Sequence, residues 1–310
     1  MKIFIKIIVG LLLLLVVAAL AIWFRPSLIL DKESVKKEVA LPSSHFMQWK
    51  DAKVHYTLEG KGSRTILMIH GFGGSFRNFD NLMPYLQDSF RIIRLDLPGF
   101  GLSDYTKDSD GSILGNYSDF FTTFFDTLQL DSVILMGNSM GGAVSWTIAS
   151  QRPEKISRMI LLNSAGYEIE KAASKMLVFK YKTVSDIFKK GLPLSLSKNG
   201  LEKCYADDSK INFADATLNN KITNKKGNLD FMVLMAERKE FPSSANIKKV
   251  QCPTLIIWGK EDEIIPVAHA DSFHRNIKNS IKKIYSSCGH VPMAENPAQL
   301  SKDVLDFLRQ

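Results

Sequence analysis

The feature that most constrains this chain is a serine between two glycines, at a point where a strand-like run changes into a helix-like one. Residues 132–136 form a short apolar run of the kind found in buried strands, and residues 142–149 follow with a helical pattern that stops before Pro153. Between them, residues 137–141 read Gly-Asn-Ser-Met-Gly. In this context the serine of a G-x-S-x-G sequence lies on a sharp, strained turn with its hydroxyl above the sheet. Ser139 is therefore the candidate nucleophile, and an ordinary glycine-rich turn is the alternative.

The rest of the chain alternates strand-like and helix-like segments. This alternation predicts an α/β fold, a mostly parallel sheet with helices on both faces. The 310 residues, 45% of them hydrophobic and 23% charged, have the composition of an ordinary globular chain with one large core. We expect an opening hairpin over 45–59, strands near 65–69, 91–96, 133–136, 159–163, 254–258 and 282–285, and a last helix over 297–308.

One gap in the alternation is too long for a simple connection between strands. From Ser164 to Lys249 the strand pattern stops and the sequence becomes rich in lysine, with amphipathic pieces such as 172–190 and 229–239. Structureless loops of this length are rare inside a compact domain. We therefore predict a helical cap of about residues 166–245, inserted between two strands. Its apolar residues are candidates for a pocket wall, although most would pack the cap's own core: Met176, Leu177, Phe179, Ile187, Phe188, Phe231, Met232, Leu234 and Met235.

The chain also contains partners that could activate the serine. A serine hydroxyl is a weak nucleophile at neutral pH and needs a base that a third group orients. His290 comes just after one predicted strand, and Glu261, Asp262 and Glu263 come in the turn after another. Parallel strands place such residues beyond their carboxyl ends, where open α/β sheets carry their sites. The order is Ser, acid, His, and chemistry alone leaves open which of the three carboxylates is the acid.

Backbone N–H groups are the expected partners of a developing oxyanion. In this kind of site they come from the residue after the nucleophile and from a loop after an early strand, here Met140 and Phe72. Phe72 lies in the sequence His-Gly-Phe-Gly-Gly over 70–74, whose histidine, His70, we expect to shape the loop. The other histidines outside the site are interpreted as solvated surface residues: His45, His55, His269 and His274.

Five ordered motifs together resemble those of α/β-hydrolases, over roughly residues 46–310. They are residues 70–74, Asp-Leu-Pro-Gly-Phe-Gly-Leu-Ser at 96–103, the segment 137–142, the Trp-Gly turn and its following residues at 258–266, and Gly-His-Val-Pro-Met-Ala-Glu at 289–295. The likeness is closest to the monoacylglycerol-lipase-like branch and to bacterial lipases and esterases. A serine nucleophile argues against the dehalogenase and epoxide-hydrolase branches, which attack through a carboxylate.

The resemblance implies the missing assignment and an activity. In the family the acid stands three residues after the glycine of the Trp-Gly turn, which selects Asp262, and the Asp96 motif builds a loop. The implied enzyme cleaves carboxylic esters of lipid-like substrates, acylglycerols among them, with Ser139, Asp262 and His290 as catalytic residues. The N–H groups of Phe72 and Met140 would form the oxyanion hole, and neither a metal nor an organic cofactor is implied.

Two other functions stay open. Residues 138–142 also resemble those of meta-cleavage C–C bond hydrolases, which act on aromatic-ring fragments. A hydrolase-fold binding protein without catalysis is the third possibility, and the complete set of Ser139, Asp262 and His290 argues against it.

The N-terminus carries a second strong signal. Residues 7–24 are apolar without interruption and are bounded by Lys6 and Arg25. About 18 such residues approach the roughly 20 that a helix needs to span a bilayer. We expect a transmembrane anchor over 1–25, a juxtamembrane linker over 26–45 and an extracytoplasmic catalytic domain. A cleaved secretory signal is the alternative.

The net charge of +8 has two interpretations. Lysines spread over the cap and the juxtamembrane segment would attract an anionic lipid surface, or they form an ordinary solvated surface. Nucleic-acid binding is not expected, because no recognised module and no basic stripe with interleaved aromatics is present. The oligomeric state is left open.

Overall fold

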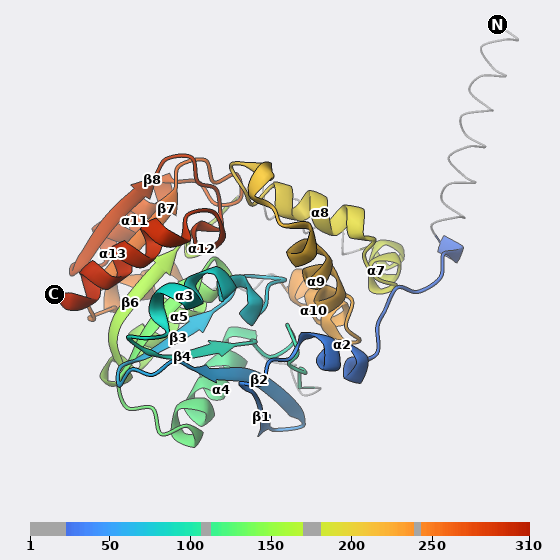
Figure 1. Cartoon of the computed structure of the whole chain (residues 1–310), viewed down its shortest axis with the longest axis horizontal. Helices are drawn as coiled ribbons and strands as arrows, with labels where there is room; N and C mark the ends of the chain where they lie inside the picture. The colour runs from blue at the N-terminus through green and yellow to red at the C-terminus, as the bar shows by residue number, and fades with distance from the viewer. Residues whose placement is uncertain (1–22, 107–112, 170–180, 239–242) are drawn as a thin grey trace, which may run out of the picture.

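One sheet of eight strands organises the described part of this computed structural model, which comprises residues 23–106, 113–169, 181–238 and 243–310 (Figure 1). β1 is antiparallel to β2 and β2 to β4, and every later pair of neighbours is parallel. The predicted α/β-hydrolase class is confirmed. In spatial order the strands are β1 (Ser44–Trp49), β2 (Ala52–Glu59), β4 (Arg91–Leu95), β3 (Thr65–Ile69), β5 (Val133–Asn138), β6 (Ile156–Leu162), β7 (Thr254–Gly259) and β8 (Ser280–Tyr285).

The central strands are buried on both faces, which explains their uninterrupted apolar sequences. Every residue of β3, β5 and β7 is buried. Successive side chains of a strand point to opposite faces. In β3, Leu67 and Ile69 accordingly join one core cluster, whereas Ile66 and Met68 join the other. Strands that read as continuous hydrophobic runs are typical of a parallel sheet covered on both sides.

Helices cover the two faces of the sheet. α5 is the most enclosed of them, since its residues 141–149 are all buried. The N-terminal end of this helix therefore lies against the middle of the sheet. α4 (Ile113–Thr127), α5 (Met140–Gln151) and α11 (Ala268–Asn276) contribute to the cluster on one face. The other cluster draws on η1 (Phe76–Leu82), α3 (Met83–Leu86), α12 (Pro292–Glu295) and α13 (Pro297–Arg309).

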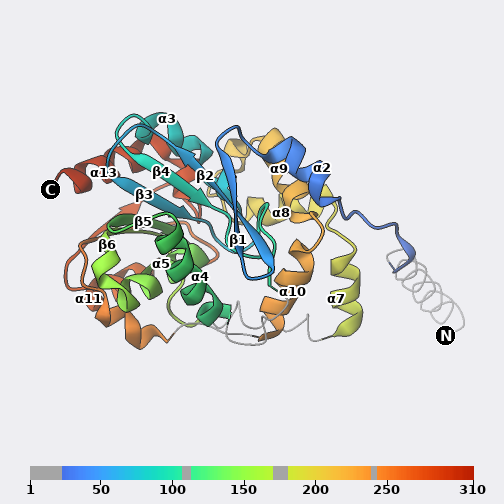
Figure 2. The same ribbon diagram turned by 90° about the horizontal axis from the view of Figure 1, so that it is seen from below.

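The long insertion between β6 and β7 is helical where the structure describes it. In both views its helices lie together beside the sheet (Figures 1 and 2). The predicted cap is thus present in the fold. The described elements between β6 and β7 are α7 (Lys182–Lys189), α8 (Leu194–Glu202), η4 (Asp208–Lys210), α9 (Phe213–Thr223), α10 (Asn228–Arg238) and η5 (Ser244–Lys249), and a short turn, η2 (Pro153–Lys155), precedes β6.

The N-terminal segment runs along the cap. Leu30 forms an isolated parallel bridge with Lys225, and the Arg25 guanidinium donates a hydrogen bond to the carbonyl oxygen of Gly191. Helix α2 (Lys32–Val39) follows this segment (Figure 2). The stretch predicted as a linker therefore contains a helix and is attached to the cap by hydrogen bonds.

The predicted membrane location has to be corrected. Among the described residues, no helix has both the length and the apolar character needed to cross a membrane. Residues 7–22 of the apolar run lie outside the described residues. Trp23, near the end of the predicted anchor, lies against the cap, with Lys190 Nζ 5.1 Å from its ring centroid. The prediction of a single-pass membrane protein with an extracytoplasmic domain is therefore wrong for the structure described.

Candidate active site

Ser139 occupies the tight turn between β5 and α5. Its backbone has φ 55° and ψ −118°, a conformation that residues with a side chain rarely adopt. A Cβ on Gly141 would lie 2.1 Å from the carbonyl oxygen of Ile69, and a Cβ on Gly137 would lie 2.3 Å from that of Gly141. Glycine is therefore required on both sides of the serine. Backbone strain of this kind persists only where the surroundings impose it, and it clusters at active sites.

The second part of the candidate site is a pair formed by His290 and Asp262. His290 Nδ1 lies 2.8 Å from Asp262 Oδ2, and the two side chains are 7% and 0% exposed. They follow the neighbouring parallel strands β8 and β7, so both lie at the same edge of the sheet. With its Nδ1–H donated to a carboxylate, a neutral imidazole has Nε2 left as a proton acceptor. This is the arrangement that a general base needs.

Asp262 accepts hydrogen bonds on both carboxylate oxygens. Oδ1 accepts from the N–H groups of Ile264 and Ile265 at 2.8 and 3.0 Å, and Oδ2 accepts from Asn163 at 2.7 Å as well as from His290. Burial alone raises the pKa of this carboxyl. The hydrogen bonds and charge of His290, followed by those from Asn163 and Ile265, outweigh burial and hold the pKa below its ordinary value. Asp262 is therefore held ionised.

The two rival carboxylates have different surroundings. Glu261 and Glu263 are both exposed, and Glu261 accepts a hydrogen bond from the Cys288 N–H at 3.1 Å. Asp262 is the carboxylate of the three that contacts the His290 ring. This geometry favours Asp262 as the candidate acid.

Two asparagines that the sequence analysis did not consider hold this site together. Asn163, directly after β6, donates through Nδ2 to Asp262 Oδ2 at 2.7 Å and to the Gly289 carbonyl at 3.2 Å. Asn138, the last residue of β5, donates to the His290 carbonyl at 3.0 Å. Both stand at the carboxyl end of a parallel strand, as the three candidate carboxylates and His290 do. Their position after a strand was the signal by which the sequence could have identified them. Their hydrogen-bond partners, in contrast, depend on the tertiary fold.

The candidate oxyanion donors lie on either side of the serine. Met140 is the first residue of α5, where the leading N–H groups have no partner within the helix. Phe72 lies in the loop after β3, next to Gly71. A Cβ on Gly71 would be only 3.1 Å from the Cβ of Ser139, so this loop passes directly beside the serine. The assignment of both donors stays a prediction.

His70 connects two loops near the serine. Its fully buried ring donates from Nδ1 to the Gly71 carbonyl at 2.7 Å and accepts at Nε2 from the Leu97 N–H at 3.1 Å. Burial lowers the pKa of His70, although the negative charge of Asp96 and the bond to Gly71 act in the opposite direction. A neutral ring with both nitrogens occupied fits the structural role expected from the sequence.

The interpretation of His55 as a solvated residue is wrong. His55 is fully buried in β2, with Nδ1 2.7 Å from Asp96 Oδ2 and Nε2 2.7 Å from the Ser44 hydroxyl. Asp96 also accepts from the N–H groups of Phe76 and Leu102, so it shapes the loops around it. The physical reason for the error is that β2 is covered on both faces, which an alternating pattern does not reveal.

Aromatic side chains pack around the loop that carries Phe72. The Phe72 and Phe100 rings meet edge to face with centroids 5.6 Å apart, and Phe100 meets Phe231 of α10 in the same way at 5.5 Å. The methyl group of Met232 lies 3.4 Å from where a Cβ on Gly73 would stand. Helix α10 of the cap therefore contributes an apolar surface directly over this loop.

The other predicted wall residues divide into two groups. Met176, Leu177 and Phe179 lie outside the described residues. The described ones are partly buried: Ile187 and Phe188 lie on α7, and Leu234 and Met235 lie on α10 and pack against the core.

Comparison with known proteins identifies the family of this fold. A family model described as alpha/beta hydrolase fold matches residues 64–297. An uncharacterised hydrolase of Bacillus subtilis, YugF, is 29% identical over 269 residues, which cover 82% of this chain and 93% of that protein. A 2-hydroxy-6-oxononadienedioate/2-hydroxy-6-oxononatrienedioate hydrolase of Pseudomonas putida is 27% identical over 265 residues, covering 83% and 92%.

A solved structure has the same fold. A meta-cleavage product hydrolase of Pseudomonas fluorescens superposes with a TM-score of 0.74 and 22% identity, covering 86% of this chain and 97% of that one. The family model spans well over half of the chain and includes strands β3 to β8, the serine turn and the histidine loop. This chain belongs to the α/β-hydrolase fold family and is a hydrolase.

Proposed function

We propose that this hydrolase is a serine esterase for carboxylic esters with an apolar, lipid-like part, acylglycerols among them. Ser139 is the nucleophile, His290 the base and Asp262 the acid. The observation that carries the proposal is the apolar surface formed by Phe72 and Met232 beside the serine turn. An uncharged ester with a hydrocarbon part can lie against such a surface without the cost of desolvating a charge. In this proposal the hydrolase domain comprises residues 46–310, and the cap of about 166–245 roofs the site.

The proposed reaction has two steps. Ser139 Oγ attacks the ester carbonyl while His290 Nε2 takes its proton, and the N–H groups of Phe72 and Met140 stabilise the oxyanion. The C–O bond to the alcohol then breaks, and His290 returns the proton to the departing oxygen. In the second step a water molecule, deprotonated by His290, attacks the acyl carbon. The bond from this carbon to Ser139 Oγ then breaks, His290 returns the proton to Oγ, and the carboxylic acid leaves. Asp262 holds the imidazole tautomer and stabilises the imidazolium in both steps.

Hydrolysis of a C–C bond is the second candidate. It is favoured by relatives such as the Pseudomonas putida hydrolase, whose named substrates are dioates and so carry two carboxylates. A dianion needs cationic or hydrogen-bonding partners when it leaves water. The aromatic and methionine side chains around the Phe72 loop fit an ester better.

A substrate comparison on the purified protein separates the two candidates. We expect p-nitrophenyl butyrate and a monoacylglycerol to be hydrolysed faster than 2-hydroxy-6-oxononadienedioate. Faster turnover of the dioate would replace the esterase proposal by the C–C hydrolase.

Covalent labelling tests the nucleophile. A fluorophosphonate probe should label the wild type, and Ser139→Ala should lose both labelling and turnover. Ser286→Ala, which changes an exposed serine after β8, is the matched control and should keep both. Persistent labelling of Ser139→Ala would remove Ser139 from the proposal.

A further inference from the structure

A short segment of the cap, residues 204–206, touches the loop that carries His290. The His290 N–H donates to the Cys204 carbonyl at 2.7 Å. A Cβ on Gly289 would lie 2.5 Å from the same carbonyl oxygen and 2.8 Å from the Ala206 nitrogen. The two backbones are therefore in direct contact. The position of the candidate base depends on the cap as well as on the sheet.

A single buried carboxylate joins these two backbones. Glu295 of α12 is 5% exposed, and its Oε2 accepts from the Gly289 N–H at 2.5 Å while its Oε1 accepts from the Ala206 N–H at 2.7 Å. Hydrogen bonds to an ionised acceptor are about twice as strong as neutral ones. The Lys210 ammonium lies 3.3 Å from the Glu295 backbone carbonyl and brings a positive charge to the same place. Glu295 thus has one oxygen on the histidine loop and the other on the cap.

The loop is held from the opposite side by the sheet. Asn138 donates to the carbonyl of His290 at 3.0 Å, so the carbonyl of the histidine is bonded to β5 and its N–H to the cap. We propose that Glu295 is a positioning residue, which holds residues 204–206 against the histidine loop and so keeps the His290 ring aligned with Ser139. This role rests on the proposed serine-hydrolase function, and it makes docking of the cap a condition for placing the base.

Replacing Glu295 by glutamine tests the positioning role, because it changes the hydrogen bonds of the side chain but not its size or burial. An amide of the same shape has one acceptor oxygen and one NH₂ donor, but the site presents two N–H donors. One hydrogen bond is lost, and an NH₂ group then faces an N–H. A displacement of about 1 Å in a catalytic group can cost about 100-fold in rate. We expect Glu295→Gln to lower kcat about 10- to 100-fold while KM changes less than about 3-fold.

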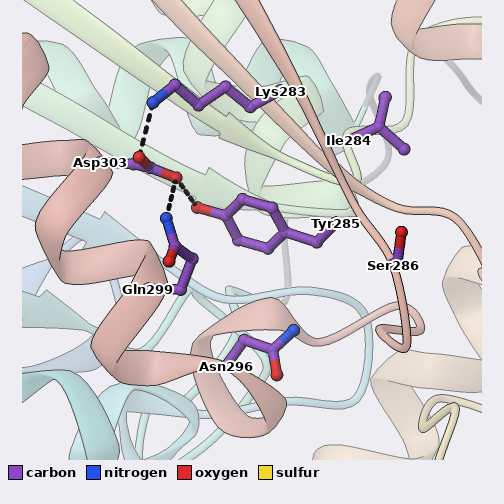
Figure 3. Close-up of a pocket in the computed structure, with 7 residues that line it drawn as sticks. All are labelled: Lys283, Ile284, Tyr285, Ser286, Asn296, Gln299 and Asp303. Atoms are coloured by element: carbon purple, nitrogen blue, oxygen red, sulfur yellow. Dashed lines mark hydrogen bonds and ion pairs between the residues drawn. The ribbon is translucent and has the colours of Figure 1, made fainter.

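A matched control is available on the neighbouring helix. Asp303 of α13 is also buried, and it accepts hydrogen bonds from the Tyr285 hydroxyl at 2.6 Å, from Lys283 at 2.5 Å and from Gln299 at 3.1 Å (Figure 3). Its partners belong to β8 and α13, not to the histidine loop. Asp303→Asn should lower Tm as Glu295→Gln does, but should leave kcat and the rate of fluorophosphonate labelling unchanged.

The experiment measures kcat, KM, labelling rate and Tm for the full chain and these variants, at a temperature well below every Tm. A slow Glu295→Gln beside a wild-type-like Asp303→Asn supports the positioning role. Equal kcat for Glu295→Gln and wild type, or an equal loss in both variants, overturns it. If Glu295→Gln does not fold, Glu295→Asp replaces it, because the shorter side chain cannot reach both N–H groups. Wild-type kcat in Glu295→Asp then overturns the role, and a loss of kcat supports it.

The wild type separates this inference from the function on which it rests. If the wild type hydrolyses p-nitrophenyl butyrate and Glu295→Gln does so equally well, only the role of Glu295 fails. If the wild type neither hydrolyses the ester nor reacts with the fluorophosphonate, the serine-hydrolase function fails, and the positioning role fails with it.

Discussion

At the scale of single residues, the candidate acid is fixed by hydrogen bonds to both of its carboxylate oxygens. The Asp262 carboxylate receives two backbone N–H groups, one amide and one imidazole. Such a carboxylate cannot rotate away without breaking several bonds at once. The imidazole of His290 is therefore held by a rigid partner, which favours one tautomer and one ring orientation.

Replacing this carboxylate by its amide tests that arrangement. Asp262→Asn removes the negative charge and offers an NH₂ group to His290 Nδ1, which selects the wrong tautomer. We expect kcat to fall by about 10⁴-fold, as for the aspartate of a Ser-His-Asp triad. Steady-state kinetics on p-nitrophenyl butyrate measure it. Glu261→Gln and Glu263→Gln change exposed neighbours and should each be mild. If kcat falls severely in Glu261→Gln and not in Asp262→Asn, Glu261 is the catalytic acid and the assignment of Asp262 is wrong.

The sequence predicts candidate site residues where they follow a strand end. Ser139, Asp262 and His290 each follow a strand, the choice of Asp262 among three carboxylates comes from the resemblance to α/β-hydrolases, and the structure brings Asp262 and His290 into contact. Asn163 obeys the same rule, but its partner Asp262 stands far along the chain and only the fold reveals it. The burial of His55 was missed for a similar reason, because the cover of β2 comes from distant segments.

At the scale of elements, two helical glycines of this chain have opposite effects on stability. Gly200 lies exposed in α8, and no atom lies within 4 Å of a Cβ placed there. Gly141 is the second residue of α5, and a Cβ placed there would lie 2.1 Å from the carbonyl oxygen of Ile69. The first glycine costs helix stability, whereas the second permits the serine turn.

Alanine substitutions measure this difference. Gly200→Ala should raise the free energy of unfolding by about 0.5–1 kcal/mol, because alanine loses less conformational entropy in a helix. Gly141→Ala should destabilise the protein, since its methyl group would overlap the Ile69 carbonyl oxygen. Thermal unfolding followed by circular dichroism gives both values. A lower Tm for Gly200→Ala would contradict the open surroundings of this residue.

The elements themselves were largely predictable, because a buried parallel strand has a continuous apolar sequence. The strands expected near 65–69 and 254–258 correspond to β3 and β7. Helix α2, in the segment expected as a linker, was not predicted. It is short and mostly polar, and its buried residues are Val35 and Val39. Two apolar residues give too weak a pattern to indicate a packed helix.

At the scale of the whole molecule, buried ionisable groups set the response to acid. Burial lowers the pKa of His70, so this ring stays neutral in the folded protein. Burial raises the pKa of Asp96, but the charge and hydrogen bond of His55 outweigh it and leave the pKa below its ordinary value. In both cases the unfolded chain takes up the proton at a higher pH than the folded one. Stability therefore falls as the pH falls.

This predicts a two-part decline in Tm. The first part begins below about pH 6.5, where histidine in the unfolded chain becomes protonated, and the second below about pH 4, where aspartate does. Differential scanning calorimetry between pH 8 and pH 3 would follow both. His70→Gln should reduce the first part, whereas His45→Gln, at an exposed position, should keep it. A constant Tm between pH 7 and pH 5 in the wild type would refute the assignment to His70.

The attachment of the N-terminal segment to the cap also has a consequence for biosynthesis. Arg25 and its acceptor Gly191 are 166 residues apart in the chain. At a translation rate of about 5–20 residues per second, roughly ten to thirty seconds pass between the synthesis of the two partners. The strands β1 to β6 are synthesised during that interval, but the surface that Arg25 will contact does not yet exist. Docking of this segment is therefore a late event on the ribosome, and until then the segment is open to chaperones.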